Sequence, residues 1–135
     1  MIDNGQKQML ILKAEEARKN AYAPYSNFLV GAALLTTDGR VYCGCNVENA
    51  AFSPTCCAER VAIFSAISDG SRDFCAIAVV GNIAPCMPCG VCRQVMAEFC
   101  QSDFEIIFKG EGDSICSLTL GELLPHSFDL GDKNE

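Results

Sequence analysis

The sequence predicts an α/β fold in which helices cover the faces of one mixed β-sheet. Helical and extended patterns alternate after an opening hairpin, and this order is typical of a mixed sheet covered by helices. Residues 75–80 (CAIAVV) are continuously apolar, which indicates a strand buried on both faces. The stretch between Val80 and Phe104 is long enough to connect two parallel strands, which takes a dozen residues or more.

Local patterns support each element of the first half. The expected elements there are a helix over 6–20, strands over 28–35 and 40–47, a loop over 48–55 and a helix over 57–68. Leu10, Ala14 and Ala17 recur at the spacing of one helical face. Pro24 is expected to end this helix, because proline lacks a backbone N–H. The Asp38-Gly39 pair predicts a tight hairpin turn.

The second half continues the alternation. The expected elements are a strand over 75–80, a helix over 88–100, a strand over 104–108, a turn over 110–113 and a strand over 114–118. Thr119 and Glu122 have the spacing of a capping box, so a short helix is expected to begin there and to end at Pro125. The charged tail after about Phe128 is expected to be loose.

Composition argues against two classes of function. The chain has 135 residues, enough for one domain, and a formal net charge of −7. Nucleic-acid binding relies on clustered lysine and arginine, so we expect no nucleic-acid partner and a small ligand instead. No run of 18 or more apolar residues is present, which predicts no membrane span. The N-terminus lacks the features of a secretory signal, which favours a cytoplasmic location.

Cysteines carry the main chemical signal. The chain has ten of them, and in a cytoplasmic protein they are expected to be reduced. Cys89 and Cys92 lie three positions apart at the expected start of a helix, so both thiols share one helical face. Cys57 has the same setting at the start of the preceding helix, where the helix dipole stabilises a thiolate. Three thiolates with one open position are typical of catalytic zinc.

Several alternatives stay open on spacing alone. Cys86 pairs with Cys89 as another Cys-x-x-Cys, and Cys56 lies next to Cys57. A Cys-x-x-Cys is also typical of a redox pair or of half a structural four-cysteine zinc site. Glu59 is a candidate general acid and base, although a solvent-exposed helical glutamate has the same appearance in a sequence.

Several segments in the same order resemble the zinc nucleoside deaminases. Residues 57–59 (CAE), followed about thirty residues later by 88–92 (PCGVC), resemble the signature of that class, in which a glutamate that is not a ligand transfers protons. The closer similarity is to the small homotetrameric cytidine deaminases and extends from Tyr22 to Phe128. The segments that carry it are 24–28 (PYSNF), 30–34 (VGAAL), 44–50 (GCNVENA), 57–60 (CAER), 89–94 (CGVCRQ) and 123–128 (LLPHSF).

The resemblance implies a fold, a metal and a reaction. The fold would be three-layer α-β-α with a mixed five-stranded sheet, in a single catalytic domain over residues 1–135. Cys57, Cys89 and Cys92 would bind one Zn²⁺ per chain. Zinc-bound hydroxide would attack C4 of cytosine with Glu59 as proton shuttle, converting cytidine and deoxycytidine to uridine and deoxyuridine plus ammonia in pyrimidine salvage. Arg60 would hydrogen-bond the thiolates. Without the resemblance, we would expect Arg60 to be an ordinary surface arginine.

The resemblance also assigns the substrate pocket. Asn46 and Glu48 match residues that hydrogen-bond the ribose, although by themselves they would suit a turn. Phe28 and Ala58 match residues that contact the base, and core packing is the alternative for Phe28. Phe128 would enter the active site of a neighbouring subunit in a homotetramer.

Two other functions share part of this evidence. A deaminase of the same fold acting on another aminopyrimidine, such as a blasticidin-type antibiotic, would keep the zinc motifs, although residues 46–49 argue against it. A non-catalytic zinc-binding module or a thiol redox protein would have no use for Glu59 and Arg60.

His126 is expected at the surface. No role is assigned to the remaining cysteines: Cys43, Cys45, Cys56, Cys75, Cys86, Cys100 and Cys116.

Overall fold

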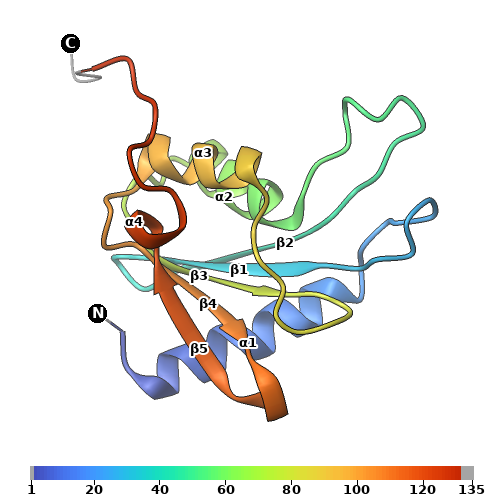
Figure 1. Ribbon diagram of the computed structural model, residues 1–135, viewed down its shortest axis with the longest axis horizontal. Coiled ribbons are helices and arrows are strands. Elements are labelled where there is room, and N and C mark those ends of the chain that lie inside the picture. The colour runs from blue at the N-terminus through green and yellow to red at the C-terminus, as the bar shows by residue number, and fades with distance from the viewer. Residues whose placement is uncertain (1, 132–135) are drawn as a thin grey trace.

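The computed structural model describes residues 2–131, in which helices lie on both faces of a five-stranded sheet (Figure 1). The strands are β1 (Gly31–Thr36), β2 (Val41–Cys45), β3 (Phe74–Val80), β4 (Glu105–Lys109) and β5 (Ile115–Thr119). The helices are α1 (Asn4–Arg18), α2 (Ala58–Ser68), α3 (Gly90–Phe99) and α4 (Leu120–Leu123), with a 3-10 turn at Glu111–Asp113. The predicted α/β class with its mixed five-stranded sheet is confirmed.

The sheet has the strand order β2-β1-β3-β4-β5. β1 runs antiparallel to both β2 and β3, and β5 runs antiparallel to β4. β3 and β4 are parallel and are connected through α3, as the length of this connection predicted. The Asp38-Gly39 turn joins β1 to β2, and Gly39 has a φ of 92°, a conformation that favours glycine.

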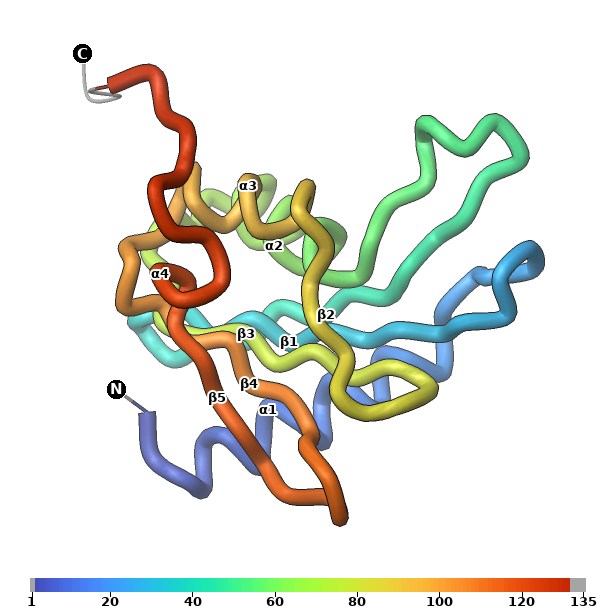
Figure 2. Tube along the Cα trace, viewed as in Figure 1, coloured from blue at the N-terminus to red at the C-terminus, as the bar shows by residue number. Residues whose placement is uncertain are grey.

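Two helical layers enclose the sheet, as Figure 2 shows. On one face, Leu10 and Ala14 of α1 pack against alternate residues of the central strands, including Ala33. On the other face, Ala62 of α2 and Met96 of α3 pack against the opposite set of strand residues. This division follows from the alternation of side chains along each strand. It places α2 and α3 side by side, with the loop before α2 projecting from the body of the molecule (Figure 1).

Several expected boundaries were wrong by one to three residues, among them the end of β2, which lies at Cys45 and not at residue 47. α1 ends at Arg18 because residues 19–21 close shorter turns, with Lys19 N–H donating to Glu16 O, so Pro24 does not end this helix. β1 begins at Gly31 and not at residue 28, since the chain turns at Asn27 with a φ of 58°. α3 begins at Gly90 rather than at residue 88, because Cys89 is its N-cap.

The end of the chain is partly described. The capping box predicted at Thr119 and Glu122 is present and opens α4. The loose tail predicted after about residue 128 lies partly outside the described residues, and residues 129–131 are exposed and form no helix or strand. None of the helices found between residues 2 and 131 has the length and apolar character needed to span a bilayer.

Candidate active site

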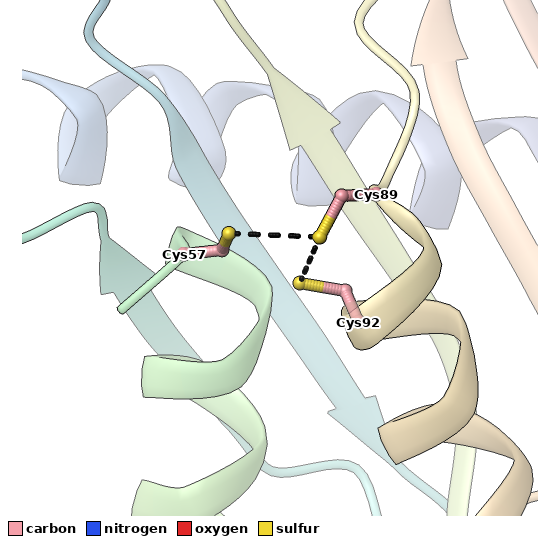
Figure 3. A group of neighbouring side chains, drawn as sticks. All are labelled: Cys57, Cys89 and Cys92. Carbon is pink, nitrogen blue, oxygen red and sulfur yellow. Dashed lines mark hydrogen bonds between the residues drawn. The ribbon is translucent and has the colours of Figure 1, made fainter. Parts of the chain in front are cut away.

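Three thiols meet where α2 and α3 begin. Cys57 is the N-cap of α2, Cys89 is the N-cap of α3, and Cys92 lies in the first turn of α3 (Figure 3). Cys57 Sγ lies 3.8 Å from Cys89 Sγ, and Cys89 Sγ lies 3.6 Å from Cys92 Sγ. Neither N-cap side chain accepts a capping hydrogen bond from the backbone of the helix that it precedes, so both sulfur atoms are free to face a common point.

The spacing of these sulfur atoms fits a metal ion. Tetrahedral zinc with Zn–S bonds of about 2.3 Å places its sulfur ligands about 3.8 Å apart. The three sulfur atoms all lie within 4.8 Å of one another, and no other such group of possible ligands occurs in the part of the chain that the structure describes. The rival thiols Cys56 and Cys86 lie outside the cluster. The chemistry and geometry of the donor set therefore fit zinc.

A neighbouring thiol and a neighbouring guanidinium stabilise the thiolate of Cys57 in this cluster. The Arg60 guanidinium donates a hydrogen bond to Cys57 Sγ at 3.2 Å. The neighbouring Cys92 thiol, together with Arg60, lowers the pKa of Cys57 to about 5 against the opposing effect of burial. The contact with Cys57 raises the pKa of Arg60, so the guanidinium remains charged. Contact with Cys57 and burial raise the pKa of Cys92 when no metal is bound.

Glu59 lies one residue beyond the first residue of α2 and is only 4% exposed. Burial raises the pKa of its carboxyl to about 7, and the nearby Cys57 adds to this effect. The sequence left open whether Glu59 is a solvent-exposed helical residue, and the structure rejects that alternative. A carboxyl with a pKa near neutrality can both accept and release a proton under physiological conditions.

The cluster borders a cavity of about 260 Å³. Its walls include five residues expected at the site: Phe28, Asn46, Glu48, Ala58 and Glu59. Cys57 and Cys89 line the same cavity, whereas Cys92 is fully buried behind them. The structure thus brings thiols, a buried carboxyl and polar side chains from three separate segments around one space.

Asn46 and Glu48 lie where β2 has ended, and both hold neighbouring backbone. Asn46 Oδ1 accepts from Val30 N–H at 2.9 Å, and its Nδ2 donates to Phe28 O at 2.8 Å. Glu48 accepts from the backbone N–H groups of Tyr25 and Ser26 at 2.9 and 3.2 Å, and from the Ser26 hydroxyl. The Ser26 hydroxyl and these N–H groups lower the pKa of Glu48, so it is an anion at neutral pH.

Comparison with known proteins identifies the family. The sequence model described as "Cytidine and deoxycytidylate deaminase zinc-binding region" matches residues 4–108. The chain belongs to this family. Cytidine deaminase of Halalkalibacterium halodurans is 51% identical over 130 residues, covering 96% of this chain and 98% of that protein. The crystal structure of cytidine deaminase from Burkholderia pseudomallei is 50% identical, with a TM-score of 0.85, and the match covers 90% and 98% of the two chains.

A more distant relative bears on the alternative function. Blasticidin-S deaminase of Bacillus cereus is 31% identical over 105 residues, covering 71% of this chain and 74% of that protein. Several relatives that match at higher identity over more of the chain are cytidine deaminases. The protein is thus an enzyme of the cytidine deaminase family, a group of hydrolytic deaminases.

Phe128 lies apart from the cavity of its own chain. Its side chain is 69% exposed, and Gln94 Nε2 donates to its backbone carbonyl at 3.0 Å. The ring is therefore neither part of the core nor a wall of the cavity. His126 is exposed, as expected. Entry of Phe128 into the site of a neighbouring subunit remains a prediction.

Part of the cavity wall was not predicted from the sequence. The additional lining residues are Val30, Thr55, Cys56, Cys86 and Met87. Cys86 and Cys56 were considered only as rival metal ligands, yet both contribute to the wall. Burial raises the pKa of Cys86 to about 11, so this thiol is neutral. Its position directly before the Met87-Pro88-Cys89 segment was the only signal that could have placed it there.

Proposed function

We propose that this protein catalyses the zinc-dependent hydrolysis of cytidine and deoxycytidine to uridine and deoxyuridine plus ammonia, in cytoplasmic pyrimidine salvage. One observation carries the proposal: three thiols with the sulfur spacing of a zinc site border a cavity that also contains a buried glutamate. The high identity with cytidine deaminases over nearly the full chain supports the same substrate class.

Cys57, Cys89 and Cys92 would hold one zinc ion and leave its fourth position open toward the cavity. When bound, zinc supplies Lewis acidity that activates water for attack on a carbon of the base. Three thiolates reduce this acidity, because together they exceed the charge of the ion. The N-termini of α2 and α3 and the guanidinium of Arg60 withdraw electron density from the sulfur atoms and offset that effect.

Glu59 would move the protons of the reaction. Its carboxylate would take one proton from the attacking water and give it to N3 of the cytosine ring. It would then pass the second proton of that oxygen to the 4-amino group, which leaves as ammonia while the C4 carbonyl forms. One carboxyl can serve each step if it lies within hydrogen-bond reach of the atoms concerned. Burial and a pKa of about 7 suit this exchange, since neither protonation state is strongly favoured at neutral pH.

Asn46 and Glu48 would bind the sugar. Both residues line the cavity, and each has a side-chain oxygen that can accept a hydrogen bond from a ribose hydroxyl. Glu48 is an anion, so it repels a phosphate on the sugar. The site therefore favours a nucleoside over a nucleotide. Phe28 and Ala58 would contact the base from the wall of the same cavity.

A shared active site is the second part of the proposal. The exposed Phe128 ring and the exposed Phe52 ring, on the loop that projects before α2, are large apolar groups without a place in their own core. Burial of such rings between chains is favourable. We propose a homotetramer in which Phe128 covers the base in the site of a neighbouring subunit.

An ultraviolet assay with a substrate panel tests the function. Cytidine and deoxycytidine are expected to lose absorbance on conversion to their uracil products, whereas adenosine is not converted. Preferential turnover of blasticidin S would instead support the aminopyrimidine-antibiotic alternative, for which the Bacillus cereus relative gives some support.

Glu59→Gln should keep the fold and one zinc per chain but lose about 10²- to 10⁴-fold in kcat, as expected for a lost general acid and base. Near-normal turnover by this variant would remove Glu59 from the mechanism.

A further inference from the structure

Phe28 occupies the cavity wall without belonging to a strand. β1 begins at Gly31, so the backbone at residues 27–30 lacks a regular ladder on either side. The chain also turns sharply at Asn27, immediately before Phe28. A ring that contacts a substrate must nevertheless be held in one position to bind well. Something other than strand pairing must fix this segment.

One side of the segment is held by Asn46, on the side of β2. If the register between β1 and β2 continued, Asn46 would lie opposite Val30. Its backbone N–H still donates to Val30 O at 3.2 Å, while its side chain accepts from Val30 N–H and donates to Phe28 O. The side chain thus extends the pairing by one residue beyond the end of β2.

The other side is held by Asn82, which follows β3 by two residues. If the register between β1 and β3 continued, Asn82 would lie opposite Leu29. Its Oδ1 accepts from Leu29 N–H at 3.3 Å, and its Nδ2 donates to Asn27 O at 2.8 Å. The amide of Asn82 therefore binds the residue before Phe28 and the residue after it.

Two further contacts fix Asn82 and bring its loop against the ring. Arg18, the last residue of α1, donates from Nη1 to Asn82 Oδ1 at 2.9 Å. The residue before Asn82 is Gly81, and a Cβ built on it would lie only 2.9 Å from Phe28 Cε1. The segment that follows β3 thus contacts the Phe28 ring through its backbone and the flanking peptide groups through Asn82.

We propose that Asn82 is a positioning residue for substrate binding, which acts by holding Phe28 in the wall of the cavity. This inference rests on the proposed function, because it assigns Phe28 to contact with the nucleoside. An amide is suited to the task because it combines one acceptor and one donor on a single planar group. Asn82 lies outside the set of residues lining the cavity, so its effect on the nucleoside is indirect, through the segment that contains Phe28.

The kinetic test separates positioning from a general loss of structure. In Asn82→Ala the segment loses two hydrogen bonds, so KM for cytidine should rise by about tenfold while kcat stays within about twofold. The inhibition constant of uridine should rise in parallel. Asn20→Ala is the matched control, because Asn20 is an exposed asparagine two residues after the end of α1, and the substitution should leave both constants unchanged. A lower kcat with unchanged KM would overturn the proposal.

A double-mutant cycle tests whether Asn82 acts through Phe28. Once Phe28→Ala has removed the ring, adding Asn82→Ala should change KM by less than about twofold, because coupled residues are not additive. Full additivity of the two effects would overturn the proposal. Asn82→Asp keeps the acceptor for Leu29 and Arg18 but loses the donor to Asn27, so its KM should lie between wild type and Asn82→Ala.

Folding and function can be distinguished in the same experiment. If both Asn82 variants are insoluble, Asn82 is required for folding and the positioning role is wrong. If the wild-type protein does not deaminate cytidine, the proposed function itself fails. Active wild-type protein with an unchanged KM in Asn82→Ala refutes only the role of Asn82.

Discussion

The close approach of α2 to the sheet predicts that Gly44→Ala will weaken zinc binding at the proposed site, although Gly44 is not a ligand. Gly44 lies on β2 and faces α2. A Cβ at this position would lie 2.5 Å from the carbonyl oxygen of Ala58 and 2.6 Å from the backbone nitrogen of Ala62. Both are backbone atoms, so no side-chain rotation relieves the overlap.

The size of the displacement follows from these distances. Ordinary contact begins at 3.4 Å, so the start of α2 must move away by roughly 0.9 Å. Cys57 is the N-cap of this helix and moves with it. Metal–ligand distances tolerate a change of only about 0.2 Å, so Cys57 leaves the position that Cys89 and Cys92 require. We expect zinc affinity to fall by about 10- to 100-fold, and the free energy of unfolding to fall by about 1–3 kcal/mol, as is typical of overpacking.

A matched control lies on the opposite face of the sheet. In Gly31→Ala the new Cβ would lie 1.9 Å from Ala14 O of α1, an even closer overlap, but α1 carries no ligand. Zinc per chain and affinity are measured by competition with a chelator, and stability by urea unfolding. Gly31→Ala should lose at least as much stability as Gly44→Ala while its folded fraction keeps zinc. Normal zinc affinity in Gly44→Ala, or equal loss of affinity in both variants, would refute the reasoning.

Three further predictions concern the ligands, the shared site and the substrate. Cys57→Ala should lose zinc in elemental analysis, whereas Cys56→Ala and Cys86→Ala should keep it; the reverse pattern would reject the ligand assignment. Refolding Glu59→Gln together with Phe128→Ala should give more activity than the average of the two parents, because some mixed sites regain both residues. Activity equal to that average would place Phe128 in its own chain's site. Cytidine 5′-monophosphate should be a far poorer substrate than cytidine, and comparable kcat/KM values would contradict a sugar-binding carboxylate.

Much of this protein follows from local sequence. The capping box at Thr119 and Glu122 and the Asp38-Gly39 turn depend on residues within one turn of each other, so each could be predicted from a few letters. The length of the segment between β3 and β4 allowed a parallel connection, which the structure has. The spacing of Cys89 and Cys92 on a helix likewise fixed their shared face.

Other features depended on contacts between distant segments. Spacing alone left Cys57 in competition with Cys56, and only the side-by-side packing of α2 and α3 brings Cys57 to the other two thiols. The burial of Glu59, and with it the raised pKa, likewise could not be predicted from its neighbours in the sequence.

The start of β1 shows the limit of local reasoning most clearly. The apolar residues from Phe28 onward have the composition of a strand, yet the ladder begins only at Gly31. The neighbouring strands end there, and the side chains of Asn46 and Asn82 bond the backbone in their place. The sequence by itself determined which groups this enzyme has and which local structures they form. Only the tertiary structure decided which of them meet, because a contact between residues far apart in the chain depends on strand register and helix packing.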